Sequence, residues 1–249
     1  MRLFVDLPLL SGAELALPPG AARHAQVRRV QPGDTLALFD GHGSDWPAEV
    51  LAVGRSEVRV RVGLPLAVDR ELPLHITVAL GMPANERMDA VMEKATEMGV
   101  ARIQPLHTER SVLRLNGERA DKKRAHWQAV AEAACEQCGR ARVPVVAPVR
   151  ALNDWLAGLA REAAAEGDSL RLLLSLQPDA QPLPQRGAAL ALQPAVRRVI
   201  TLNGPEGGLT PDEESAARRA GFLPTTMGSR VLRADTAPLA ALAWLGWSA

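Results

Sequence analysis

The stretch TLNGPEGGLTPDEE, residues 201–214, places a glycine-rich turn between a strand and a helix. An apolar run ends at Leu202, and a well-signalled helix begins eight residues later. Thr210 and Glu213 have the spacing of a capping box, and Pro211 occupies the first helical position, where proline is favoured. We therefore predict a turn whose backbone amides face outward just past the end of a strand.

The composition of this turn limits what it can hold. Its glycines allow backbone conformations and close approaches that other residues resist. No Lys-Ser or Lys-Thr pair follows them, which excludes a phosphate-binding P-loop, and the spacing is not Gly-x-Gly-x-x-Gly. Glu206 would repel a phosphate. The turn therefore suits a neutral or cationic ligand, or it is a tight turn with no ligand.

A second stretch, MGSRVLRADTAPLAAL (residues 227–242), also runs from strand through irregular loop to helix, with Asp235 or Thr236 as the expected N-cap. In the loop two guanidinium side chains flank two aliphatic ones: Arg230, Val231, Leu232 and Arg233. Such a loop can cover a flat ring while offering positive charge to an anion. The alternative is a pair of surface arginines bound to nearby carboxylates.

Outward from these stretches, strand-like apolar runs alternate with helical ones. The strand-like runs are 74–81, 100–107, 143–149, 170–176, 196–202 and 221–228, and the main helical runs are 85–99, 122–139, 152–167 and 235–247. In the first helical run Asn85 is the expected cap and Gly99 the expected stop. This alternation predicts an α/β domain with a parallel sheet covered by helices, in which ligands gather beyond the carboxyl ends of the strands.

Residues 1–70 read as a separate, β-rich unit. Short strand-like runs at 34–41, 46–53 and 56–63 are separated by turn residues, and a short helical piece precedes them at 21–30. Residues 64–73 resemble a linker. We predict a small barrel or sandwich at 1–70 and a larger domain at 71–249.

Composition places the chain among ordinary globular proteins. Its 249 residues carry a net charge of +1, with 47% hydrophobic and 23% charged residues. No apolar run is long enough to span a bilayer, and the N-terminus lacks the layout of a signal peptide, so we expect a soluble cytoplasmic protein. The near-neutral charge still permits local basic patches, of which one is Arg23, Arg28 and Arg29.

The two cysteines, Cys135 and Cys138, are too few for a closed zinc site, and no histidine pair completes one. They fall late in an alanine-rich helical run, whereas a redox-active pair should open a helix. We therefore expect structural cysteines without a lowered thiol pKa, and no bound metal.

Five motifs together resemble a known family: MEKATEMGV (92–100), HTERSV (107–112), CEQCGR (135–140), GPEGGLTPDE (204–213) and MGSRVLRADTA (227–237). The family is that of the 16S ribosomal RNA uracil-N3 methyltransferases of the SPOUT superfamily, and the resemblance covers nearly the whole chain. Residues 24–50 resemble its PUA-like RNA-binding barrel. The resemblance implies a C-terminal SPOUT domain with a deep trefoil knot, an exception to the usual unknotted topology.

The resemblance also implies a cofactor, S-adenosylmethionine, bound by loops within the knot. Carried over to this sequence, the cofactor-binding residues are Leu176, Leu202, Asn203, Gly204, Glu206, Gly207, Gly208, Met227, Gly228, Ser229, Val231 and Leu232. Three positions depart from the family pattern. Asn203 stands where an aliphatic residue is usual, Ser229 where proline is usual, and Ala234-Asp235 where Thr-Glu is expected.

For catalysis, the resemblance implies methyl transfer to the ring nitrogen N3 of a uridine in 16S ribosomal RNA, free or in the small subunit. We expect Arg233 to stabilise the uracil anion, with Glu206 or Asp235 accepting the proton or orienting the arginine. Expected RNA-binding residues are Arg23, Arg28, Arg29, Lys94, Arg110 and Arg114. With 3% aromatic residues and no tyrosine, recognition should rest on RNA shape and backbone.

The resemblance implies a homodimer, and the apolar run 237–247 suits either a dimer interface or a helix facing its own core. Two alternative functions stay open. One is a SPOUT methyltransferase acting on another RNA target. The other is a non-catalytic RNA-binding factor, which would bind RNA without binding the cofactor.

Overall fold

The computed structural model describes residues 1–166, 169–186 and 197–247. The chain divides into two compact units. The first comprises residues 1–71 together with 132–143, and the second comprises 72–131 together with 144–249. The sequence places the domain boundary after residue 70, and this division into domains stays a prediction. The return of residues 132–143 to the first unit was not predicted, because the pattern of these residues simply continues a helix.

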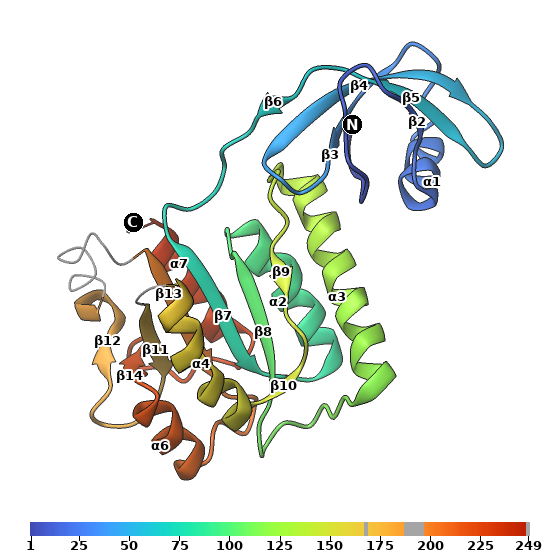
Figure 1. Cartoon of the computed structure of the whole chain (residues 1–249). Coiled ribbons are helices and arrows are strands. Elements are labelled where there is room, and N and C mark those ends of the chain that lie inside the picture. Colours follow the sequence, from blue (N-terminus) through green and yellow to red (C-terminus); the bar gives the residue numbers. More distant parts are fainter. Residues whose placement is uncertain (167–168, 187–196, 248–249) are drawn as a thin grey trace. The chain divides into compact units, whose positions relative to one another are not determined.

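The first unit is built from six strands and one helix, labelled in Figure 1. The strands are β1 (Arg2–Phe4), β2 (Glu14–Ala16), β3 (Thr35–Phe39), β4 (Ser44–Val53), β5 (Val58–Val62) and β6 (Leu66–Ala67), and the helix is α1 (Pro19–Val27). They pair in the order β1-β3-β4-β5-β2, and β6 pairs with β4. In β5 the valines are buried and the arginines exposed, as the alternating sequence predicts. Strand β6 falls within residues 64–73, so part of the expected linker is a short strand.

The end of helix α3 (Gly117–Cys138) lies in the first unit and is tied to β1. Arg2 donates from Nη1 to the Cys135 carbonyl at 2.6 Å and from Nη2 to the Arg140 carbonyl at 2.8 Å. The buried Arg140 pairs in turn with Glu71. These bonds attach the end of α3 and the residues after it to β1; the Cys135 carbonyl also accepts from the backbone N–H of Gly139 at 3.0 Å.

Both cysteines are free, but the expected absence of a lowered pKa is wrong for Cys138. A hydrogen bond from the Cys135 thiol, aided by the backbone amide and the charge of Arg140, lowers the pKa of Cys138 to about 6. The same pairing and burial raise the pKa of Cys135. The place of the pair late in the helix did not predict this. Cys135 and Arg140 are neighbours of Cys138 in the sequence, and only Arg2, whose charge also lowers this pKa, comes from a distant segment.

The second unit contains a parallel sheet. Its strands are β7 (His75–Gly81), β8 (Arg102–His107), β9 (Val145–Val146), β10 (Arg150–Ala151), β11 (Leu170–Leu174), β12 (Gln181–Pro182), β13 (Arg198–Asn203) and β14 (Leu223–Thr226). Among the described residues every ladder is parallel, in the order β10-β8-β7-β13-β11-β14-β12, with β9 on β8. The predicted strand 196–202 corresponds to β13, which begins at Arg198 and ends at Asn203, and Val196 lies outside the described residues.

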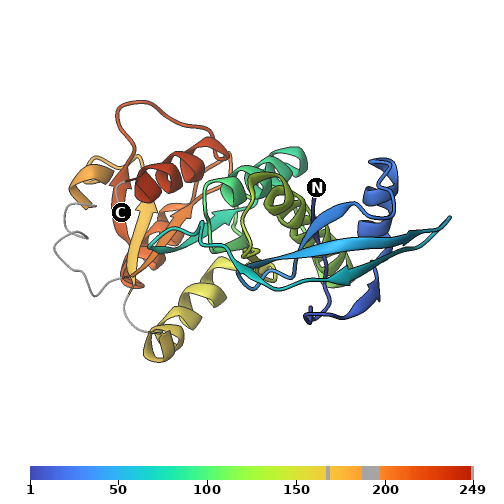
Figure 2. The same cartoon turned by 90° about the horizontal axis from the view of Figure 1, so that it is seen from above.

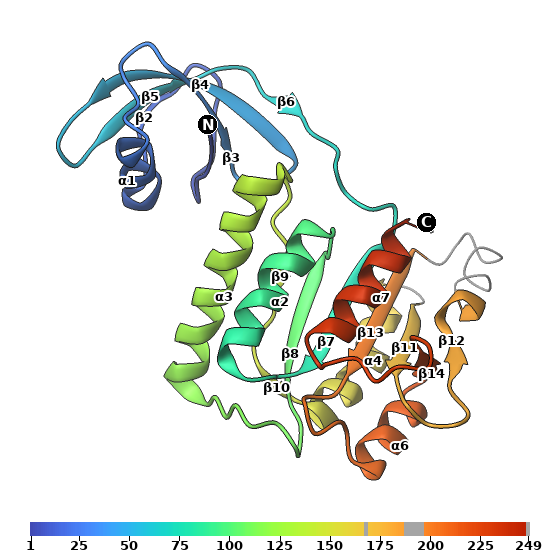
Figure 3. The same cartoon turned by 180° about the vertical axis from the view of Figure 1, so that it is seen from behind.

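Helices cover both faces of this sheet. They are α2 (Asn85–Glu97), α3, α4 (Leu152–Glu166), α6 (Pro211–Arg219) and α7 (Thr236–Trp247). Seen from behind in Figure 3, α2 and α7 lie in front of the sheet, and Figure 2 shows α4 on the opposite side from α7. Successive β13 residues alternate between the two cores, Val199 with α2 and α7 and Ile200 with α4 and α6. The strands are therefore buried on both faces, as parallel strands usually are.

Two local expectations have different outcomes. Gly99, with a positive φ of 91°, ends α2 as predicted. The expected Asn85 cap is wrong, because α2 begins at Asn85 and the N-cap is Ala84, which offers no side-chain capping bond. In α7 the residues Ala241, Leu242 and Leu245 are buried, so part of this apolar helix faces its own core.

Candidate functional site

Three adjacent strands, β13, β11 and β14, end at one edge of the sheet and open into a cavity of about 580 Å³. Three segments form most of the cavity wall: residues 174–177 at the end of β11, the glycine turn (residues 203–209) at the end of β13, and much of the arginine loop (residues 227–235) after β14. The sheet order reverses here, because β13 lies between β7 and β11. Carboxyl ends of strands at such a switch point are where ligands bind in α/β sheets.

The glycine turn needs glycine at two of its positions for different reasons. A Cβ on Gly204 would come within 2.6 Å of backbone atoms of Gly208 and Leu209, so the turn closes too tightly for any side chain there. Gly208 has a φ of 69°, a left-handed conformation that other residues adopt at a cost. The helix that follows is α6, and its predicted capping box between Thr210 and Glu213 is present.

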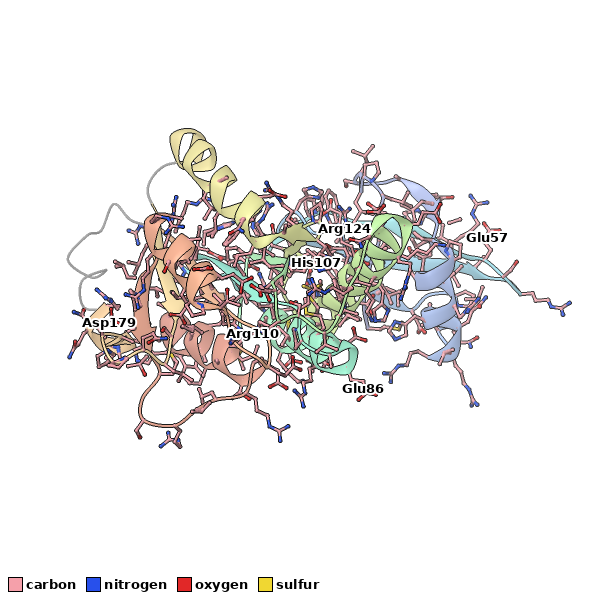
Figure 4. The ribbon with its side chains drawn as sticks, turned by 90° about the horizontal axis from the view of Figure 1, so that it is seen from below. Glu57, Glu86, His107, Arg110, Arg124 and Asp179 are labelled. Carbon is pink, nitrogen blue, oxygen red and sulfur yellow. The ribbon has the colours of Figure 1, made fainter. Side chains whose placement is uncertain are left out.

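Residues of the loop after β8 form hydrogen bonds with the glycine turn and with the start of α6. Arg110, labelled in Figure 4, donates to the carbonyl oxygen of Gly207 at 2.8 Å. The backbone N–H of Glu109 donates to the Glu213 carboxylate at 2.8 Å. Arg110 lines the cavity and supports the turn, and its expected contact with RNA stays a prediction.

Glu206 projects from the glycine turn to the start of α2. Its Oε1 accepts a hydrogen bond from Arg87 at 2.8 Å and another from the backbone N–H of Ala84 at 3.2 Å. The pair is partly buried, with exposed fractions of 36% for Arg87 and 31% for Glu206. Glu206 therefore anchors the turn to α2, while its Oε2 has no hydrogen bond from any described residue.

The arginine loop presents two exposed guanidinium groups at the cavity. Arg230 and Arg233 both line it, and neither has an acidic partner among the described residues, so the alternative of surface arginines bound to carboxylates is not found there. Beside them Val231 is 76% exposed, and Leu176 on another part of the wall is 68% exposed. Apolar and cationic groups thus share one wall, as the sequence predicts.

Most of the predicted cofactor residues line the cavity: Leu176, Asn203, Gly204, Glu206, Gly207, Gly208, Met227, Val231 and Leu232. Three others lie outside its wall. The Leu202 side chain is fully buried in the core on the α4 side of the sheet, and Gly228 and Ser229 are exposed in the arginine loop. Asp235 lies in a separate apolar hollow between α2 and α7.

The predicted RNA-binding residues differ in what they contact. Arg23, Arg28 and Arg29 are exposed on and just after α1. Lys94 is instead held by Glu93 at 2.7 Å and Glu97 at 2.8 Å, and these bonds raise its pKa. Arg114 donates to the Glu109 carbonyl. Lys94 and Arg114 do not line the cavity.

Several cavity residues were not predicted, namely Arg87, Ser175, Gln177, Glu214, Thr225 and Thr226. Ser175 directly follows β11 and its backbone N–H donates to the Thr225 carbonyl at 2.9 Å. Its place directly after a strand could have predicted that it lines the cavity. The sequence gives no such indication for Arg87, because only the packing of α2 brings it to the glycine turn.

Neither a metal site nor a membrane span is found in the described parts of the chain. Among them no three His, Cys, Asp or Glu side chains are grouped to bind a metal ion. None of the described helices combines the length and apolar character needed to cross a bilayer.

Comparisons with known proteins agree with this geometry. The profile of a family described as an RNA methyltransferase domain matches residues 70–246, and that of an RNA methyltransferase PUA domain matches residues 17–63. The chain is 33% identical over 245 residues to ribosomal RNA small subunit methyltransferase E of Synechocystis sp., covering 97% of this chain and 76% of that protein.

Two solved structures are also similar. Ribosomal RNA small subunit methyltransferase E of Neisseria gonorrhoeae, bound to S-adenosyl methionine, is 36% identical with a TM-score of 0.87, and the match covers 98% of this chain and 96% of that one. A Legionella pneumophila structure in complex with the cofactor SAM is 34% identical with a TM-score of 0.86, over 98% and 96% of the two chains.

Proposed function

We propose that this chain, which belongs to the ribosomal RNA small subunit methyltransferase E family, transfers a methyl group from S-adenosylmethionine to N3 of one uridine in 16S ribosomal RNA. The observation that carries the proposal is the cavity at the ends of β11, β13 and β14. The strand order alone marks this edge of the sheet as a ligand site, and similar chains are bound to this cofactor.

The residues present fit the cofactor. A volume of about 580 Å³ is within the usual range for a ligand of this size. The carboxylate of Glu214 suits its positive groups, and Arg230 suits its carboxylate. Leu176 and Val231 offer apolar surface for a flat ring. The glycine turn would approach the ligand with its backbone.

When bound, the cofactor supplies a methyl group on a sulfonium, which makes it a good electrophile. The chain must then position the uracil and help N3 lose its proton, because this nitrogen is mostly protonated near neutral pH. We assign Arg233 to the uracil carbonyl oxygens, where its fixed charge stabilises the anion. Of the two candidate carboxylates, Glu206 lines the cavity, and its Oε2 accepts no hydrogen bond from the described residues, so we assign it the proton.

For RNA binding we propose the exposed arginines of the first unit, Arg23, Arg28 and Arg29. Guanidinium groups bind backbone phosphates without reading sequence, so affinity should depend strongly on salt. A uridine within a helical region must leave its stack to reach a cavity. We expect this to occur in the cytoplasm, on 16S RNA in the small subunit.

A trefoil knot and a homodimer remain predictions. For the dimer, the supporting observation is the apolar hollow beside α7, lined by Ala90, Val91, Met98, Leu239, Ala240 and Ala243, together with Trp247, which is 90% exposed. A second copy of the chain would cover this surface. Sedimentation at micromolar concentration should give twice the mass of one chain, and a single-chain mass would contradict the dimer.

The decisive experiment incubates the protein with labelled S-adenosylmethionine and small subunits that lack the modification, followed by mass mapping of the product. We expect one methyl group on N3 of one uridine. Labelling of another RNA, or of a ribose hydroxyl, would favour a different methyltransferase specificity. RNA binding without cofactor uptake would favour the non-catalytic alternative.

A further inference from the structure

Asn203 connects the two loops that form most of the cavity wall. It is the last residue of β13 and is 4% exposed. Its Nδ2 donates to the carbonyl oxygen of Gly204 and to that of Ala234, both at 3.1 Å. Ala234 lies 31 residues further along the chain, in the arginine loop. Among the described residues no other hydrogen bond joins the glycine turn to this loop.

The orientation of the Asn203 amide follows from its partners. Both are carbonyl oxygens, which only accept hydrogen bonds, so the group that faces them must be the NH₂. The amide oxygen then points elsewhere, and it is buried without a hydrogen-bond partner among the described residues. An aliphatic side chain would avoid this buried acceptor. What the amide contributes is therefore the pair of donated bonds.

The hydrogen bond to the Ala234 carbonyl restrains the arginine loop next to Arg233. The loop contains no helix or strand between Met227 and Asp235. At its far end the Arg233 carbonyl accepts from the backbone N–H groups of Thr236 and Ala237, each at 3.0 Å. The two successive peptide groups that follow Arg233 are thus both held, the first by the start of α7 and the second by Asn203.

We infer that Asn203 is a positioning residue for methyl transfer, holding the backbone at Arg233 against the glycine turn so that the exposed guanidinium faces the cavity. The inference rests on the proposed function, because it gives Asn203 its effect through Arg233. Asn203 itself touches neither the uracil nor the transferred methyl group in this scheme.

The test replaces the donor while keeping the shape. Asn203→Asp has the size of asparagine, but its carboxylate cannot donate and faces two carbonyl oxygens. Asn203→Leu removes both donors without adding charge. Thr201→Val is the matched control, because Thr201 lies two residues earlier on the same strand and its buried hydroxyl has no partner among the described residues.

Two readouts are measured on each variant. The first is hydrogen exchange of the 227–235 backbone by mass spectrometry, without RNA or cofactor. The second is the rate of methyl transfer at saturating substrates. We expect Asn203→Asp and Asn203→Leu to exchange at least tenfold faster in this loop and to lose at least tenfold in kcat. Thr201→Val should match the wild type in both.

Asn203→Asp also has a pH signature that a general loss of packing would not give. A carboxyl that is buried and faces carbonyl oxygens has a raised pKa, and once protonated it can donate one hydrogen bond. Its loop exchange, corrected for the intrinsic pH dependence, and its relative kcat should therefore move toward wild-type values as pH falls. Asn203→Leu should show no such recovery.

Unchanged exchange in the loop of both Asn203 variants overturns the inference, whatever their turnover. Faster exchange with undiminished kcat also overturns it, because the loop then has no bearing on catalysis. If the wild-type protein transfers no methyl group to ribosomal RNA, the proposed function fails, and with it the catalytic role of Asn203, while the exchange result separately decides whether Asn203 holds the loop.

Discussion

The guanidinium of Arg87 lies 2.8 Å from the carboxylate of Glu206 and joins the first turns of α2 to the glycine turn, across 119 positions in the chain. The N–H of Ala84 reaches the same oxygen. Because this oxygen is held from two directions, the turn keeps its shape at the cavity. The pair is partly exposed, so its contribution to stability is modest.

Arg87→Met should weaken cofactor binding by loosening the glycine turn. We expect the Kd for S-adenosylmethionine, measured by calorimetry, to rise about fivefold, which corresponds to about 1 kcal/mol. Arg124→Met, on an exposed residue of α3, is the control and should leave the Kd unchanged. An unchanged Kd in Arg87→Met would show that the turn is held without this pair.

Glu206→Gln separates the anchoring role from the proton-accepting role. Glutamine can still accept hydrogen bonds from Arg87 and Ala84, but it cannot take a proton from uracil. We expect kcat to fall by about 10²-fold or more, with a cofactor Kd close to the wild-type value. Equal turnover in the two proteins would assign the proton to another group or to water.

Arg233→Ala should slow methyl transfer without affecting cofactor uptake. Removing a fixed positive charge that stabilises a developing anion typically costs about 10²-fold in kcat. Arg230→Ala makes the same charge change three residues earlier on the same wall. We expect this variant to weaken the binding of S-adenosylmethionine instead. Single-turnover rates and calorimetry distinguish the two effects. Wild-type turnover in Arg233→Ala would remove it from the mechanism.

Replacing Arg23, Arg28 and Arg29 together by glutamine should weaken RNA binding and reduce its salt dependence. Each lost phosphate contact lowers the slope of log Kd against log salt by about 0.7 to 0.9, so the slope of the triple variant should be lower by about 2 to 3. Arg61→Gln is the matched control, because Glu14 and Glu49 already neutralise Arg61. If the slopes of both variants equal that of the wild type, the RNA contacts lie elsewhere.

Asp89 should make the stability of the second unit depend on acid pH. Burial would raise its pKa, but hydrogen bonds from His126 and Lys123 outweigh this and hold the pKa below 3.8. The charged carboxylate therefore stabilises the folded state above pH 3.8, and this contribution is lost as pH falls through the lower, folded-state pKa. Asp89→Asn keeps an acceptor for Trp127, which donates to Asp89 at 2.9 Å.

We expect Asp89→Asn to have a lower free energy of unfolding than the wild type at pH 7, measured by urea titration. The difference should shrink as the pH is lowered toward 2, where the wild-type carboxyl is protonated as well. A difference that does not change between these pH values would mean that charge at Asp89 contributes nothing to folding.

Much of the site could be predicted because its signals are local. Gly204 and Gly208 are required by the shape of a single turn, and the capping box of α6 involves residues three apart. The alternation of apolar runs likewise predicts a parallel sheet, since each strand carries its own burial pattern. Such features depend on neighbouring residues, so the sequence alone was enough for them.

Contacts between segments that are distant in the chain could not be predicted from the sequence. The Asn85 cap was wrong because the carboxylate of Glu206, 122 residues from Ala84, takes the hydrogen bond of its N–H. The charge of Arg2, near the start of the chain, also contributes to the lowered pKa of Cys138. Propensity and spacing carry no information about such partners.

The sequence by itself determined the elements, the glycine turn and the alternation of arginine with aliphatic residues in the loop after β14. Tertiary structure decided that β13 inserts between β7 and β11, which brings this turn beside the ends of β11 and β14. It also decided that Asp235 lies outside the cavity while Arg87 lines it. The physical reason is that strand order is set by how crossover helices pack on the two faces of the sheet, and that packing is a property of the whole domain.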